Sequence, residues 1–95
     1  MIRVVAKFLF QPGRADEATE IARELIDLTR KEAGCVQYNL VQSVENKDLL
    51  VVLEEWETQA HLDNHSASKH FGELVPKLAA MCVEPPVVDI FILLI

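Results

Sequence analysis

Ionisable side chains that could move a proton stand in the second half of this 95-residue chain. His65 carries an imidazole, which titrates close to neutral pH and therefore suits a general base. Glu54 ends an otherwise apolar run, so its carboxyl group needs a partner or a raised pKa. Glu54 could orient His65 or act as the base itself. Equally, both residues could be structural, His65 as a helix cap and Glu54 as an acceptor for loop amides.

Two histidines have a spacing that also occurs in metal sites. His61 and His65 are four residues apart with Asp63 between them, so on a helix they share a face and could bind a metal together with His70 or an acid. However, Leu62 stands where the zinc-binding helix motif has its catalytic Glu, and the spacing supplies no definite third ligand. We therefore predict no metal site.

Aromatic residues near these groups could contact a ligand. Tyr38 could donate its hydroxyl to a substrate oxygen, or fill the core while that hydroxyl reaches water. Trp56 lies on the same side of its strand as Glu54, by the two-residue period, and could stack on a ligand or pack in the core. Asn39 points to the opposite face from Tyr38, so only one of these two can line a pocket on one side of the sheet.

Composition excludes several classes of function. The formal charge is -6, with 15 acidic and 9 basic residues and no basic cluster, which argues against nucleic-acid binding. The longest apolar run, residues 90–95, is far too short for a membrane helix, so we expect no membrane contact. Cys35 and Cys82 do not form a disulfide framework, which favours a cytoplasmic protein with free thiols. No glycine-rich phosphate loop and no serine-hydrolase elbow occur.

Apolar periodicity and turn residues divide the chain into elements. A helix is predicted from Ala15 to about Lys31, with Gly34 capping its end, because small and apolar residues recur every three to four positions. Thr58 and Ser68 are predicted caps of two further helices, and Pro76 predicts a kink or a fresh helix in the second. Extended segments are predicted at residues 2–10, 35–43, 49–56 and 87–95.

This order predicts one α+β domain over residues 1–95. Strand, helix, two strands, helices and strand make the split βαβ arrangement of ferredoxin-like folds, with a four-stranded antiparallel sheet covered by helices on one face. The strands at 49–53 and 90–95 are apolar on both faces, and strand one adds Val5 and Leu9 opposite its core residues. A second sheet must cover that other face, so we predict a homodimer packed sheet to sheet.

Three short stretches stand on these predicted elements in a characteristic order. They are Glu32-Ala33-Gly34-Cys35 with Tyr38-Asn39 just beyond, Glu54-Glu55-Trp56-Glu57, and His65-Ser66-Ala67-Ser68-Lys69-His70-Phe71. Together they resemble the antibiotic-biosynthesis-monooxygenase family of dimeric α+β barrel proteins, in particular its quinol-monooxygenase-like branch. The resemblance covers essentially the full length of the chain.

The resemblance implies an enzyme that oxidises a small quinol or polycyclic aromatic with O2 and needs no cofactor, neither metal nor flavin. It implies a pocket between the helical face of the sheet and the short helices after the third strand. His65 matches the family's motif, as does His70, for which a cap or dimer contact is the commoner role. The haem-degrading branch has an iron-binding histidine where this chain has Val75, and an Asn where it has Ala6, so haem degradation is disfavoured.

The leading hypothesis is therefore a homodimeric, cofactor-independent monooxygenase. His65, aided by Glu54, deprotonates a small aromatic substrate, which then reduces O2 in an apolar pocket. The expected substrate-binding residues are Tyr38, Trp56, Phe71, Phe8, Phe10 and His61. Two alternatives stay open: a non-catalytic dimer that binds a small molecule, and an isomerase or decarboxylase that uses the same base without O2.

Overall fold

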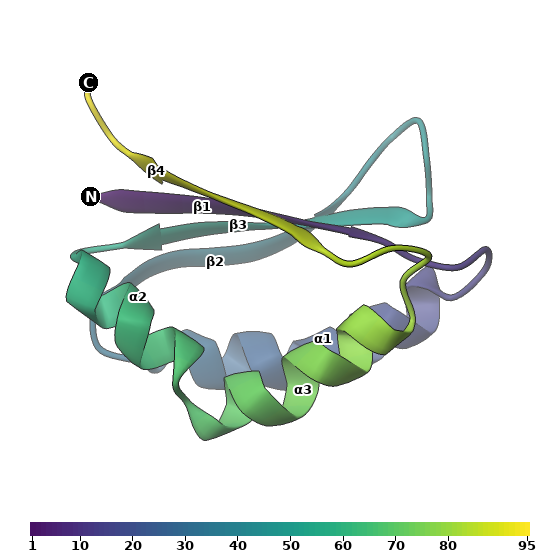
Figure 1. The fold of residues 1–95 in the computed structure, drawn as a ribbon, viewed down its shortest axis with the longest axis horizontal. Coiled ribbons are helices and arrows are strands. Elements are labelled where there is room, and N and C mark those ends of the chain that lie inside the picture. Colours follow the sequence, from purple (N-terminus) through teal and green to yellow (C-terminus); the bar gives the residue numbers. More distant parts are fainter.

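The computed structural model describes residues 1–95 and places three helices on one face of a four-stranded antiparallel sheet (Figure 1). The strand order is β2-β3-β1-β4, so the predicted ferredoxin-like α+β fold is confirmed. None of the helices is long and apolar enough to cross a membrane. The elements are β1 Ile2–Leu9, α1 Ala15–Thr29, β2 Cys35–Gln42, β3 Leu49–Trp56, α2 Gln59–Ser66, α3 Lys69–Ala80 and β4 Val87–Ile92.

The two central strands form the floor of the core through strict alternation. On β1, Val4, Ala6 and Phe8 are buried and face the helices, while the residues between them face away. β3 buries every second residue from Leu50 to Trp56 in the same way. Successive strand side chains point to opposite faces, so this alternation fixes which side chains can meet the helices.

Helix α1 packs on the sheet through small residues. Its buried positions are Ala15, Ala18, Ala22, Leu25 and Thr29, which form one stripe because they recur every three to four residues. The helix ends earlier than predicted. Arg30 is its C-cap, and Gly34 lies beyond the helix end rather than closing it.

The two later helices begin at the predicted caps. The Thr58 hydroxyl accepts a hydrogen bond from the backbone N–H of His61, and the Ser68 hydroxyl accepts one from that of Phe71. Contrary to the alternative of a fresh helix at Pro76, α3 continues through that residue as one helix. Between these two helices the chain turns at Ala67 and Ser68.

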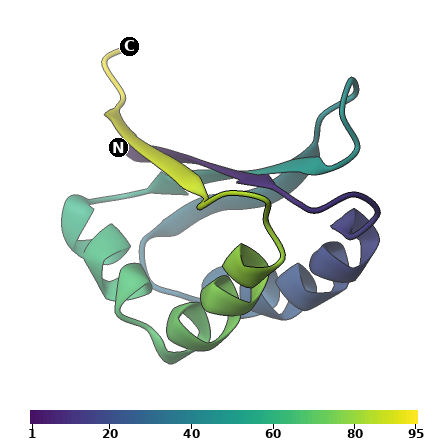
Figure 2. The same ribbon diagram turned by 45° about the vertical axis from the view of Figure 1, so that its right-hand side comes forward.

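Strand β4 is shorter than predicted and is exposed throughout. It ends at Ile92 rather than residue 95, and all six of its residues are exposed. The last three residues extend past the sheet, away from the helices (Figure 2). The sequence predicted that β4 is apolar on both faces. In the folded chain these apolar side chains are not covered.

Gly34 turns the chain where the α1–β2 connection passes α2. Its φ is +79°, a conformation that residues with a side chain rarely adopt, and a Cβ there would overlap the imidazole ring of His61. Gly13 has nearly the same φ, +81°, yet faces open space. Comparing the two glycines therefore separates the free-energy cost of the backbone conformation from that of the steric contact with His61.

We predict that Gly34→Ala destabilises the protein more than Gly13→Ala does. The left-handed conformation alone should cost about 1–2 kcal/mol at either position. Displacing the His61 ring should add about 1–3 kcal/mol at position 34, as overpacking does elsewhere. Urea unfolding of both variants measures the difference. Equal losses of unfolding free energy would show that the His61 ring moves aside without cost.

Candidate active site

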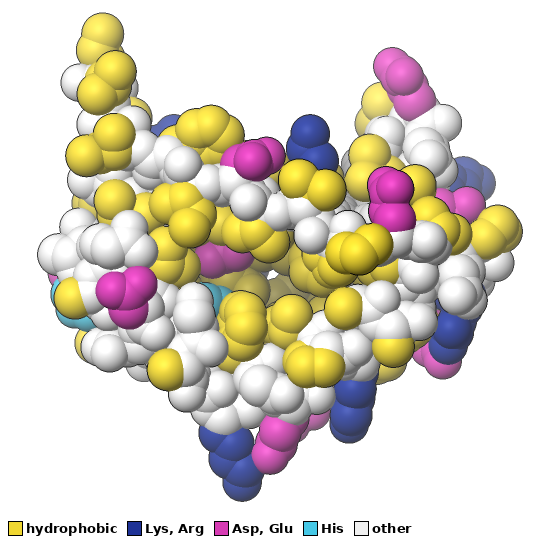
Figure 3. Space-filling model, viewed as in Figure 1, with side chains coloured by type: hydrophobic (Ala, Val, Ile, Leu, Met, Phe, Trp, Pro, Cys, Tyr) yellow, Lys and Arg dark blue, Asp and Glu magenta, His cyan; other side chains and the backbone are white.

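A cavity of about 160 Å³ lies between the helices and the sheet, edged mostly by hydrophobic side chains (Figure 3). Exposed residues of β4 form part of its wall, so the cavity is open to solvent on that side. The sheet contributes Val4, Ala6, Phe8, Tyr38, Val52, Glu54, Val88 and Ile90. The rest of the lining is Leu25, Gln59, Leu62, Asp63, His65, Ser66, Phe71, Val75 and Pro86.

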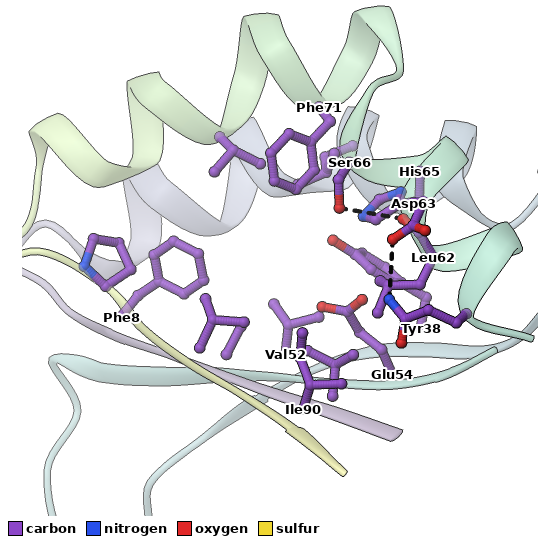
Figure 4. Close-up of a pocket in the computed structure, with 17 residues that line it drawn as sticks. Phe8, Tyr38, Val52, Glu54, Leu62, Asp63, His65, Ser66, Phe71 and Ile90 are labelled. Atoms are coloured by element: carbon purple, nitrogen blue, oxygen red, sulfur yellow. Dashed lines mark hydrogen bonds between the residues drawn. The ribbon is translucent and has the colours of Figure 1, made fainter. Parts of the chain in front are cut away.

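Strand register places the polar lining residues of the sheet side by side. Tyr38 on β2 is opposite Glu54 on β3, and Glu54 is opposite Val4 on β1, which in turn is opposite Ile90 on β4. This row of cross-strand neighbours crosses the whole cavity floor. Its polar end is therefore at β2 and its apolar end at β4 (Figure 4).

Glu54 is a buried acid with one partner in the protein. The indole Nε1–H of Trp56 donates a hydrogen bond of 3.0 Å to its Oε1. Burial raises the pKa of the Glu54 carboxyl to about 7; the Trp56 hydrogen bond lowers this pKa, and the charge of Glu32 raises it further. At neutral pH the carboxyl group is thus protonated in a large share of molecules, and it can then donate a hydrogen bond from Oε2.

The side chain of His65 projects from α2 and is surrounded by three aromatic rings. Its ring centroid lies 5.3 Å from that of Tyr38, 4.7 Å from that of Trp56 and 5.1 Å from that of Phe71. The residue is only 1% exposed, and its Nε2 atom has no hydrogen-bond partner. Burial lowers the pKa of the imidazole below its usual 6.5, although the hydrogen bond and charge of Glu32 oppose this. The ring is therefore neutral at physiological pH.

Glu32 provides the other contact of His65. Its Oε2 lies 2.7 Å from Nδ1 of His65 and 2.9 Å from Nε2 of His70. The sequence offered Glu54 as a carboxylate that orients His65, but the carboxylate in contact with His65 is Glu32, from the connection after α1. Glu32 stands in one of the stretches that carry the family resemblance, but its sequence position in a loop gave no sign that it would meet α2.

The eight predicted site residues do not all reach the cavity. Five line it: Phe8, Tyr38, Glu54, His65 and Phe71. Phe10 lies beyond the end of β1, stacked on Phe8 with ring centroids 5.9 Å apart, and Trp56 is fully buried behind His65. His61 lies outside the cavity at the start of α2, with its ring against Gly34 and its Nδ1 2.8 Å from the Thr58 hydroxyl.

One cluster has the residue types of a metal site. Donor atoms of Glu32, His65 and His70 lie within 4.8 Å of one another. Their hydrogen bonds already account for this arrangement, since one carboxylate oxygen accepts from both rings. His61, which the sequence places one turn before His65, is not part of the cluster.

Geometry thus defines a class: a ferredoxin-like domain with a largely apolar cavity that contains a buried histidine and a buried glutamate. Comparison with known proteins identifies the family. The profile of the family described as antibiotic biosynthesis monooxygenase matches residues 1–77. YcnE of Bacillus subtilis (strain 168) is 31% identical over 77 residues, 81% of each chain.

Solved structures agree with this assignment. A crystal structure of a conserved protein from Methanosarcina mazei Go1 has a TM-score of 0.92 at 38% identity, over 95% of this chain and 89% of the other. A crystal structure described as antibiotic biosynthesis monooxygenase has a TM-score of 0.93 at 32% identity, over 99% of both chains. The chain belongs to the antibiotic biosynthesis monooxygenase family, as its sequence stretches indicated.

We predict that Glu54→Gln stabilises the protein at alkaline pH. The folded protein binds the Glu54 proton more tightly than the unfolded chain does, with pKa values of about 7 and 4.5. Stability is therefore lost as pH rises from 4.5 to 7, by up to about 3 kcal/mol. Gln has no proton to lose and keeps an oxygen for Trp56.

Unfolding curves at fixed protein concentration, recorded from pH 4 to pH 8.5, measure this effect. The stabilisation by Glu54→Gln should be full at pH 8 and absent below pH 4.5. Glu73→Gln, which neutralises an exposed carboxylate on α3, is the matched control and should show no such pH dependence. If the stability difference between Glu54→Gln and wild type did not change with pH, the raised pKa of the buried Glu54 carboxyl group would be contradicted.

Proposed function

We propose that this protein is a cofactor-independent monooxygenase that oxidises a small hydroxylated aromatic, of quinol or polycyclic type, with O2. The observation that carries the proposal is the buried His65, which lines an apolar cavity and whose Nε2 has no partner in the protein. A neutral imidazole nitrogen that is kept dry is ready to accept a phenolic proton. Membership of a family described by its monooxygenase activity supports the same reaction.

In this reaction the substrate supplies all the electrons. His65 removes a proton, and the resulting electron-rich anion passes one electron to O2 to give a substrate radical and superoxide. The two combine at a ring carbon, and the peroxide takes back the proton from His65. Loss of water then converts a CH2 group of the substrate's ring tautomer to a carbonyl, so that CH2 and O2 become C=O and H2O.

Glu54 and Tyr38 act on the substrate oxygen as donors. Burial raises the pKa of the Tyr38 hydroxyl, so it keeps its proton. The protonated Glu54 donates from Oε2, because Oε1 already accepts from Trp56. Both groups would stabilise the negative charge that develops as His65 takes the proton.

The rest of the cavity suits a flat, apolar substrate. Phe8 and Phe71 supply aromatic walls, and Val52 lies on the sheet side between Phe8 and Glu54 (Figure 4). A hydroxylated ring placed with its oxygen toward Glu54 would leave its apolar part toward β4. The substrate therefore needs one polar edge and one hydrocarbon edge.

We predict that the metal-stripped protein consumes O2 with at least one member of a panel of quinols and polycyclic phenols. His65→Gln, which keeps the side-chain volume, should lower kcat by about 10²- to 10⁴-fold, the usual contribution of a general base. His61→Gln makes the same change outside the cavity and should leave the rate unaltered. Equal rates for wild type and His65→Gln across the panel would remove His65 as the base.

The same assay distinguishes the alternative functions. A binding protein without catalysis would be stabilised against unfolding by a panel member and show no turnover. An isomerase or decarboxylase would form product at the same rate without O2. Only the monooxygenase stops when O2 is removed.

We further propose that the protein works as a homodimer packed through the helix-free face of its sheet. On that face Val5 and Leu53 are only half-buried in the isolated chain, while Val41, Val87 and Phe91 are 40–52% exposed. An apolar sheet face of this kind costs free energy in water until another sheet covers it. This arrangement leaves each cavity under the helices of its own subunit.

We predict that Val41→Glu weakens the dimer at least about 100-fold, because it would bury a charge between two sheets. Val41 is 40% exposed in the single chain, so the subunit itself tolerates the substitution. Val44→Glu is the matched control, since Val44 is 99% exposed in the β2–β3 loop. Analytical ultracentrifugation measures both; a monomeric wild type at high micromolar concentration would refute the dimer.

A further inference from the structure

One carboxylate oxygen joins three segments of the chain around the proposed base. Glu32 lies between α1 and β2, His65 lies near the end of α2, and His70 lies at the start of α3. Oε2 of Glu32 is within hydrogen-bond distance of one nitrogen of each ring, at 2.7 and 2.9 Å. An ionised carboxylate has no proton to donate, so each of these ring nitrogens must carry the hydrogen.

This contact decides which nitrogen of His65 can act as a base. A neutral imidazole has one N–H and one lone pair. If Nδ1 donates to Glu32, the lone pair is on Nε2, the atom without a partner in the protein. We propose that Glu32 and His70 are positioning residues, which fix the tautomer of His65 that offers an unprotonated Nε2 to the substrate. The catalytic consequence rests on the proposed function, whereas the tautomer itself does not.

The charge of Glu32 has a second effect on the base. When His65 takes a proton, an imidazolium forms in a site that is only 1% exposed, and the adjacent carboxylate offsets that charge. Glu32 is itself 17% exposed. The charged or titratable groups around His65 are Glu32, His70 and, from the sheet, Glu54 and Tyr38; Trp56 and Phe71 supply only rings.

His70 restrains the carboxylate. Its Nε2–H donates to the same oxygen that accepts from His65, and its side chain is 17% exposed. Without this donor, Glu32 could turn toward water and release His65. His70 therefore acts through Glu32, and any donor of similar reach should replace it.

The tautomer can be measured without a substrate. Long-range ¹H–¹⁵N NMR spectra of the full-length protein at pH 7.5 distinguish the two neutral forms of each histidine. We expect His65 in the Nδ1–H form in wild type. Glu32→Leu removes the acceptor and should populate the Nε2–H form, whereas Glu32→Gln keeps an oxygen acceptor and should retain the Nδ1–H form without the negative charge.

The rate and its pH dependence test the same residues in catalysis. Glu32→Leu should lower kcat at least about 10-fold with KM little changed, as loss of an orienting partner does in other sites. Glu32→Gln should move the acid limb of the kcat profile to lower pH, because the Glu32 charge raises the pKa of His65. His70→Leu should lower kcat, and His70→Gln, which keeps an N–H donor, should restore it. Glu73→Gln serves as the charge control.

The outcomes separate this inference from the proposed function. An Nε2–H form of His65 in wild type, or a tautomer that Glu32→Leu leaves unchanged, overturns it whatever the activity. A tautomer that switches as expected in a protein that oxidises no member of the quinol panel supports the positioning role and refutes the monooxygenase. If Glu32→Leu does not fold, the comparison of His70→Leu with His70→Gln in the same spectra and assays decides the question.

Discussion

Three helices cover a four-stranded sheet only in part, and this incomplete cover shapes the whole molecule. α1, α2 and α3 pack over the sheet, and all of β4 is left exposed. The space that this incomplete layer leaves is the cavity, and its wall beside β4 is open. A fully closed layer would bury more apolar area and gain stability, but it would leave no room for a ligand.

Three polar residues of the cavity offset the free-energy cost of burial in different ways. Glu54 binds its proton more tightly and accepts a hydrogen bond from Trp56. His65 stays neutral and places one nitrogen against Glu32, with the other left unpaired. Tyr38 keeps its hydroxyl proton. Each solution follows from the rule that a buried charge needs a partner or must be neutralised, and together they leave an uncharged imidazole and protonated donors at one end of a largely apolar cavity.

Much of the architecture could be predicted from local patterns. The alternation on β1 and β3 gave the face of the core, and the hydroxyls of Thr58 and Ser68 gave two helix starts, since these signals act within a few residues. Predictions were less accurate where contacts between residues far apart in the sequence determine the local conformation. Gly34 suits a helix cap by type, but its positive φ serves a turn packed against His61. Residues 93–95 read as strand, yet β4 ends at Ile92.

The fold class, the family and the apolar character of both sheet faces could be inferred from the sequence alone. These properties follow from periodicity and from short motifs, which need no knowledge of distant contacts. The set of residues that share the cavity depends on tertiary packing. This packing places His65, Glu54 and Tyr38 at the cavity and leaves out Phe10, Trp56 and His61. It also pairs His65 with Glu32 across 33 positions of sequence. The reason is that a hydrogen bond between two loops or helices depends on how those elements pack, and no local pattern of residues specifies that packing.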